Sequence, residues 1–136
     1  MKPVCFAALA SAAAVGLVVL GRSRPRPARR FGMVIGIRPD RISAYEALHA
    51  ASHPGVRDLL TKYHMHSFSI YLKELEDERV YLFGCYEYTG SDYDADMASL
   101  AAEPRNQGWL ASTDPMQLPL PGLTTWATMR EVYFNP

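Results

Sequence analysis

The sequence contains little cysteine and none of the short motifs that mark the common cofactor-dependent or nucleophilic enzymes. Its two cysteines, Cys5 and Cys85, fall in segments of different character, which excludes a disulfide framework. No Gly-rich phosphate loop, nucleophile elbow or Cys/His metal cluster occurs, so we expect neither a nucleotide site nor a metal site. The length of 136 residues is typical of a chain with one main domain.

Acidic residues are absent from the first 39 positions, although the whole chain has a formal net charge of zero. Residues 1–30 carry six basic side chains, whereas residues 31–136 carry eight basic and fourteen acidic ones. Phosphate binding requires a basic surface, so this acidic body argues against nucleic acid as a partner. We therefore divide the chain into an N-terminal segment, residues 1–30, and a folded body, residues 31–136.

The N-terminal segment contains an unbroken run of apolar and small side chains, residues 4–20, followed by an Arg- and Pro-rich linker. As a helix the run spans about 26 Å, a little less than a bilayer core. The arginines follow the run, and the positive-inside rule places their side in the cytosol or matrix. We predict a hydrophobic helix that forms a single-pass N-terminal membrane anchor, with the body on the cytosolic side.

Two other interpretations of this segment stay open. The lack of acids and the abundance of arginine are also typical of a mitochondrial-type transit segment, which targets a protein to an organelle. A secretory signal peptide fits less well, because no small-x-small cleavage site follows the run and the arginines lie on the wrong side of it.

The body alternates between two hydrophobic periods. A period of two predicts strands over residues 31–37, 65–72, 79–88 and 125–134. Apolar spacings of three and four predict helices from residue 40, over 56–63, over 91–100 and from 104 past 110. This order is typical of the ferredoxin-like fold, an α+β βαββαβ arrangement with a four-stranded antiparallel sheet and helices on one face. The other face of the sheet then frames a pocket or meets a second subunit.

Local signals mark where these elements begin and end. Asp40 is the expected N-cap of the first helix, and Pro54 interrupts that helix. Ser91 and Asp94 form an expected capping box, and Pro104 suits the first turn of the last helix. Residues 73–78 are expected to form a charged hairpin loop. Three further prolines exclude regular structure in their loop: Pro115, Pro119 and Pro121.

Tyr45 and His49 are the first candidates for chemistry. They are four residues apart and share one face of the predicted helix. An imidazole exchanges protons near neutral pH, and a neighbouring phenol orients a hydroxyl or relays its proton. A half-buried Tyr beside a surface His explains the same spacing. His49 and His53 also have the spacing of two zinc ligands, but Pro54 disturbs that geometry and no Glu follows the first His.

Trp109 is the second candidate, because an indole beside a pocket provides a flat apolar wall on which the C–H face of a sugar packs. Packing in the core explains this residue equally well.

Five segments in order carry a resemblance to a known family. They are YEALHAASHPGV, HSFSIYL, FGCYEYTGSDYDADMASLAAEP, NQGWLASTDPMQ and REVYFNP. Together they cover most of residues 31–136, and they resemble the L-rhamnose mutarotase family. The resemblance implies small ferredoxin-like homodimers of the dimeric α+β barrel type. It also implies an isomerase that interconverts the α and β anomers of L-rhamnose, or of a related aldose, without a cofactor.

The resemblance also assigns roles to residues. It implies a general acid at His49 and a substrate contact at Tyr45. A hydroxyl-bearing aromatic of the family falls on Phe68 here, and a Trp-Trp pair falls on Trp109 and Leu110. These two departures remove one hydroxyl and one ring from the expected pocket, so we expect altered sugar preference or weaker binding.

Our hypothesis from the sequence is that His49 protonates the ring oxygen of the sugar while Tyr45, or a water it holds, takes the anomeric proton. Two alternatives remain. The first is a membrane-tethered, catalytically degenerate sugar-binding or interaction protein on the same fold. The second is another dimeric ferredoxin-like enzyme, such as a small cofactor-free monooxygenase.

Overall fold

The structure is a computed structural model that describes residues 27–136. The strands in this part of the chain are β1 (Arg29–Ile37), β2 (Met65–Glu74), β3 (Val80–Tyr88), β4 (Gln117–Leu118) and β5 (Ala127–Met129). The helices are α1 (Ile42–His49), α2 (Arg57–Lys62), α3 (Tyr93–Ala102) and α4 (Pro104–Thr113), with single 3₁₀ turns η1 (Pro39–Arg41) and η2 (Asp114–Met116).

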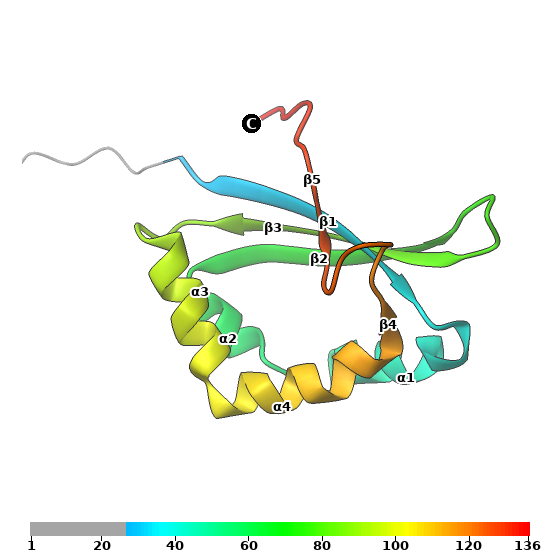
Figure 1. Ribbon diagram of the computed structural model, residues 1–136. Coiled ribbons are helices and arrows are strands. Elements are labelled where there is room, and N and C mark those ends of the chain that lie inside the picture. Colours follow the sequence, from blue (N-terminus) through cyan, green and yellow to red (C-terminus); the bar gives the residue numbers. More distant parts are fainter. Residues whose placement is uncertain (1–26) are drawn as a thin grey trace, which may run out of the picture.

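The strands form one curled antiparallel sheet in the order β2-β3-β1-β4, and β5 also pairs with β1. β4 lies opposite the end of β1, at Gly36 and Ile37, and β5 lies opposite its middle, from Gly32 to Val34. Two short segments therefore share the fourth position of the sheet. All four helices lie on one face (Figure 1). The expected α+β fold with a four-stranded antiparallel sheet and helices on one face is confirmed.

The core lies between the sheet and the helices because side chains alternate along each strand. Ile35 and Ile37 of β1 and Leu82 of β3 face the helices and are at most 2% exposed. They pack with Tyr45 of α1 in one cluster. A second cluster joins α2, α3 and the far end of the sheet. Each such aliphatic side chain contributes about 1.5–3 kcal/mol by its burial.

The side chains that alternate with these core residues form what we call the open face of the sheet, which no described helix covers. Tyr81 and Phe83 of β3 lie on it, with Leu118 of β4 and Met129 of β5 in register beside β1. Leu118 is 49% exposed and Met129 is 38% exposed.

Two expected helix starts were wrong by one or two residues. Asp40 lies in η1 and does not cap α1, since its carboxylate instead accepts hydrogen bonds from the Arg38 guanidinium. The N-cap of α3 is Asp92 rather than Ser91, because the Asp92 carboxylate accepts from the backbone N–H of Ala95 at 3.1 Å. The helix predicted to start at Pro104 is confirmed as α4.

The C-terminal region also differs from the prediction. The strand expected over residues 125–134 is limited to β5, and beyond it Glu131 forms an ion pair with Arg30 at 2.7 Å. The loop expected to lack regular structure contains η2 and β4. Gln117 and Leu118 lie between Pro115 and Pro119, and, unlike proline, each has a backbone N–H. They can therefore pair with β1.

The charged hairpin loop is shorter than expected. β2 continues through Glu74, and the backbone N–H of Leu75 bonds the carbonyl of Arg79 to close the turn. In the part of the chain described, no helix has the length and apolarity needed to cross a bilayer. The predicted anchor at residues 4–20 lies outside the described residues.

Candidate active site

We call the side of the sheet that faces the helices the covered face. A cavity of about 320 Å³ lies between it and the helices, within the size range of small-molecule sites. All five residues predicted from the sequence line it: Tyr45 and His49 of α1, Phe68 of β2, and Trp109 and Leu110 of α4. Those of α1 and β2 also border an adjoining hollow of about 560 Å³ between these elements. The fold thus brings together candidates that are up to 65 residues apart in the sequence.

His49 is the last residue of α1, and its ring is oriented by two neighbours. Its Nδ1 lies 2.8 Å from the backbone oxygen of Tyr45. A carbonyl oxygen only accepts, so Nδ1 carries the proton and the neutral ring has its lone pair on Nε2. The imidazole also stacks on the Tyr45 ring at 4.1 Å between centroids and meets the edge of Trp109 at 5.0 Å. This arrangement fixes both the tautomer and the plane of the ring.

Burial lowers the pKa of His49 below its usual value of about 6.5. The hydrogen bond to the Tyr45 carbonyl acts in the opposite direction but does not reverse the shift, and the charge on Arg57 lowers the pKa further. At pH 7 the neutral form of the imidazole therefore predominates. Its Nε2 is then a proton acceptor rather than a donor.

Arg57 explains how the chain stays ordered where α1 ends. Its guanidinium donates to the carbonyl oxygens of His49 at 2.7 Å, Ala50 at 3.0 Å and His53 at 2.6 Å. The His49 carbonyl is at the C-terminus of α1, where carbonyls lack partners within the helix, and those of Ala50 and His53 lie in the turn that follows. One side chain thus closes the break that Pro54 introduces and fixes the backbone of His49.

One ring nitrogen of each of His49 and His53 already has a partner in the protein. The Nδ1 of His53 accepts a hydrogen bond from the backbone N–H of Gly55 at 3.2 Å. Across residues 27–136, no group of three or more His, Cys, Asp or Glu side chains is placed to hold a metal ion.

Tyr45 is 5% exposed, and burial raises the pKa of its hydroxyl to about 12. The nearby side chain of Gln117, at the start of β4, offsets part of this rise in the pKa. Tyr45 therefore remains protonated throughout the neutral range. Beside a neutral imidazole it is the natural proton donor of the pair.

Phe68, Trp109 and Leu110 supply the apolar walls. A bulge between His66 and Ser69 shifts the register of β2 against β3, and Phe68 lies within it. Its ring meets Tyr86 edge-on at 5.3 Å between centroids. Trp109 is half-buried, whereas Leu110 is 40% exposed.

Several polar residues that no sequence pattern had indicated line the same cavity: Asn106, Thr113, Asp114, Gln117 and Thr125. Partial burial raises the pKa of the Asp114 carboxyl. Asn106 lies three residues before Trp109 on the same helix face, a spacing that was available in the sequence. No local signal pointed to Gln117, because its contact with Tyr45 depends on the pairing of β4 with β1.

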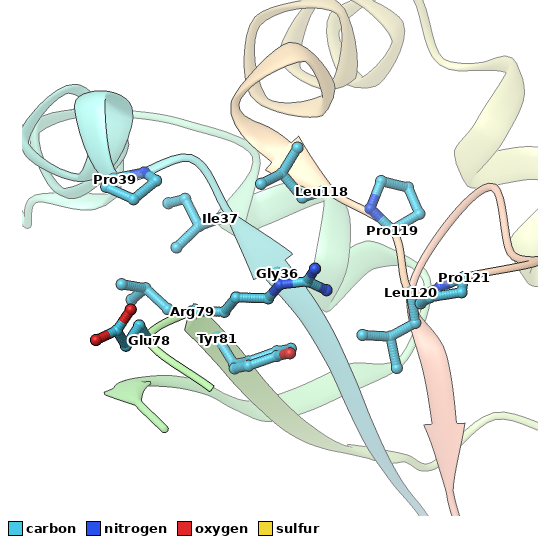
Figure 2. A pocket seen from close by; sticks show the side chains of 11 residues that line it. Gly36, Ile37, Pro39, Glu78, Arg79, Tyr81, Leu118, Pro119, Leu120 and Pro121 are labelled. Carbon is cyan, nitrogen blue, oxygen red and sulfur yellow. The ribbon is translucent and has the colours of Figure 1, made fainter. Parts of the chain in front are cut away.

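A second cavity, of about 370 Å³, lies at the end of the open face (Figure 2). Prolines and leucines of the segment around β4 form one side, and Tyr81 of β3 and Arg79, just before that strand, lie across from them. The Tyr81 hydroxyl already donates to Asp77 at 2.6 Å. None of the predicted site residues lines this cavity. Because Tyr45 and His49 line the other cavity, the cavity beneath the covered face is the candidate active site.

The fold and this cavity together define a small α+β protein with one cavity of the size of a small-molecule site. An imidazole and a phenol, which are groups able to transfer protons, line it together with the flat ring of an indole.

The family model described as L-rhamnose mutarotase matches residues 30–134, and the chain belongs to that family. It is thus an isomerase acting on carbohydrate, and the activity of the family is the interconversion of sugar anomers.

Comparison with solved structures supports the fold. The crystal structure of an L-rhamnose mutarotase from Formosa agariphila is similar with a TM-score of 0.57 and 17% sequence identity. The match covers 79% of this chain and 99% of the other. A comparison with curated proteins gave no match.

Proposed function

We propose that the cavity beneath the covered face binds L-rhamnose or a closely related aldose and that His49 and Tyr45 catalyse the exchange of its anomers. The observation that carries the proposal is the stacked imidazole–phenol pair, which has a free Nε2 and lies in the wall of one cavity. Trp109 packs against the C–H face of the sugar ring, as indole rings do in sugar sites.

Ring opening then proceeds as a paired proton transfer. The anomeric O–H gives its proton to a base, and its electron pair forms the C1=O1 carbonyl. The bond between C1 and the ring oxygen breaks, and its electron pair stays on the ring oxygen, which takes a proton from an acid. Rotation about C1–C2 and closure from the other face of the aldehyde give the second anomer.

The resting protonation states of the pair are the basis on which we assign His49 as the base and Tyr45 as the acid for ring opening. Burial lowers the pKa of the imidazole and raises the pKa of the phenol, so the resting pair holds one acceptor and one donor. This division is opposite to our hypothesis from the sequence, in which His49 gave the first proton. During ring closure the two roles exchange, as microscopic reversibility requires.

Magnetisation-exchange NMR on the anomeric protons tests this function. We expect the protein to accelerate exchange of L-rhamnose, and His49→Gln to lose about 10²–10⁴-fold of the acceleration. His66→Gln, on β2 and outside the cavity, is the matched control and should retain it. A folded wild-type protein that accelerates exchange of no aldose would contradict the proposal and favour a sugar-binding protein without activity.

We further propose that the protein is a homodimer of the dimeric α+β barrel type, with the open face as the subunit contact. Exposed apolar side chains support this, among them Leu118 and Met129, because a sheet face of this kind is typically covered. Sedimentation equilibrium tests it directly. A dimer that Phe83→Glu converts to a folded monomer supports the proposal, and a monomeric wild type contradicts it.

We propose from the sequence alone that residues 4–20 anchor the protein to a membrane with the body on the cytosolic side. Alkaline extraction of membranes from cells that express the full chain tests this. Retention in the membrane fraction supports an anchor. A shortened, soluble protein inside an organelle would instead support the transit segment.

A further inference from the structure

Asn106 has an amide without a partner in an otherwise well-satisfied interior. It lies in the first turn of α4 and is 6% exposed. Asn106 and Thr113 are the two buried polar residues of the part of the chain described. The Thr113 hydroxyl donates to the backbone oxygen of Trp109 at 3.2 Å. In contrast, no group within residues 27–136 hydrogen-bonds the side chain of Asn106.

The free amide faces the cavity. In the part of the chain described, every fully enclosed side-chain nitrogen or oxygen atom has a hydrogen-bond partner. The Asn106 amide has none, so its polar atoms border open space, and the space that Asn106 lines is the cavity of Tyr45 and His49. Native proteins pair the great majority of buried amides, which makes such a group a candidate for ligand binding.

The chemistry of the amide matches a sugar ring. An asparagine side chain offers two N–H donors and one carbonyl acceptor, and each ring hydroxyl both donates and accepts. Asn106 shares its helix face with Trp109, which is three residues further along α4. A pyranose packed on the indole therefore has its hydroxyl edge available to the amide.

We propose that the Asn106 amide binds ring hydroxyls of the sugar away from the anomeric carbon and so selects which aldoses the cavity accepts. The inference rests on the proposed function, since it places the anomeric carbon at His49. Asn106 keeps these contacts in both anomers and in the transition state, so it contributes to binding more than to the chemical step.

Replacement of Asn106 by an apolar side chain of similar size separates this role from a structural one. For Asn106→Leu we expect KM for L-rhamnose to rise about 10-fold, with kcat changed less than about 2-fold. We also expect an unchanged or higher Tm, because the variant removes an unpaired buried amide. A lower Tm with an unchanged KM would overturn the proposal. Asn135→Leu, at the exposed C-terminus, is the matched control.

Side-chain amide NMR gives a readout that does not depend on turnover. The chain has two asparagines and two glutamines, so four pairs of amide signals suffice: Asn106, Asn135, Gln107 and Gln117. The experiment uses the full 136-residue chain in a sugar-free polyoxyethylene detergent, titrated with L-rhamnose. We expect saturable shifts for Asn106, with Asn135 and Gln107 unchanged because neither lines the cavity.

The outcomes of this titration are distinct. Shifts of Gln117 and the Trp109 indole without a shift of Asn106 would overturn the inference and leave the proposed function standing. No shift in the cavity, together with no acceleration of anomer exchange, would count against the proposed function and against the inference that rests on it.

Sugars that lack one hydroxyl sharpen the assignment. The wild type is assayed with 2-, 3- and 4-deoxy-L-rhamnose. We expect KM to rise about 10-fold for the analogue that lacks the hydroxyl bound by Asn106. Asn106→Leu should add no further loss for that analogue. An equal loss for all three analogues in the variant would contradict a direct contact.

Discussion

The two faces of the sheet differ in what their side chains do. On the covered face, Leu82 is 2% exposed, and the same layer holds Tyr45 and His49 beside a cavity. On the open face, Tyr81 and Phe83 alternate with those core residues, and the Tyr81 hydroxyl is already bonded to Asp77. The two faces therefore differ in burial: Tyr45 and His49 are enclosed beside a cavity, whereas the hydroxyl of Tyr81 is tied to an exposed carboxylate. The following predictions compare the two faces.

The largest difference should appear in stability. Leu82→Ala should lower the free energy of unfolding by about 2–5 kcal/mol, because it opens a void in the core. Phe83→Ala, one residue along the same strand, should cost about 1 kcal/mol. Urea unfolding followed by circular dichroism measures both. Similar losses in the two variants would show that the faces are equally buried. A loss for Phe83→Ala that depends on protein concentration would indicate a subunit contact.

Removal of one tyrosine hydroxyl from each face should affect kcat for anomer exchange very differently. Tyr45→Phe deletes the proposed acid and should reduce kcat for anomer exchange about 10²-fold. Tyr81→Phe deletes a hydroxyl of the open face and should change kcat less than about 2-fold. Exchange NMR with L-rhamnose at saturating concentration provides the comparison. A retained rate in Tyr45→Phe would exclude its hydroxyl as the proton donor.

Arg57 should affect the pH dependence of kcat/KM, whereas an arginine at the surface should not. Arg57→Met removes three bonds to the end of α1 and a charge that lowers the pKa of His49. We expect kcat/KM to fall about 10-fold and the acidic limb of the profile to move to higher pH. Arg57→Lys keeps the charge but loses the guanidinium with its several N–H donors. We therefore expect kcat/KM to fall while the acidic limb of the pH profile stays at the wild-type position.

The control for Arg57 is Arg105→Met. Arg105 forms an ion pair with Asp58 at the surface and is not among the groups that shift the pKa of His49. Its pH profile should match the wild type. A shift of equal size in this variant would mean that net charge, rather than the contact with α1, sets the profile.

The smallest expected effect is on stability as a function of pH. The folded state lowers the pKa of His49 below the value of the unfolded chain, about 6.5. Between these two values the unfolded chain binds a proton that the folded chain does not, so the free energy of unfolding falls as the pH falls. His49→Gln should remove this component, whereas His66→Gln should retain it. Thermal unfolding between pH 7.5 and 5.5 measures the difference.

Periodicity predicted most of the architecture, because each main element has its own hydrophobic pattern. Helix starts were less predictable, because the Asp40 carboxylate binds Arg38 instead of the end of α1, and Asp92 rather than its neighbour Ser91 caps α3. The last strand was overpredicted, because an alternating pattern does not show where the partner strand ends. Only the fold shows that β4 and β5 share one edge of β1.

The shared helix face of Tyr45 and His49 was predictable from their spacing, and their proposed roles came from the family resemblance, as did the positions of Phe68 and Leu110. The protonation states were not predictable, because they depend on burial and on the Nδ1 contact with a carbonyl. Gln117 was not predictable either, since it lies 72 residues from Tyr45 in the sequence and reaches it only because β4 pairs with β1.

The central claim is that His49 rests as a neutral base with its proton on Nδ1. Nitrogen-15 NMR of the ring nitrogens as a function of pH tests it most directly. We predict the Nδ1–H tautomer at pH 7 and a pKa below 6.5, both lost from the spectrum in His49→Gln. An Nε2–H tautomer, or a pKa above 6.5, would contradict the division of roles between His49 and Tyr45.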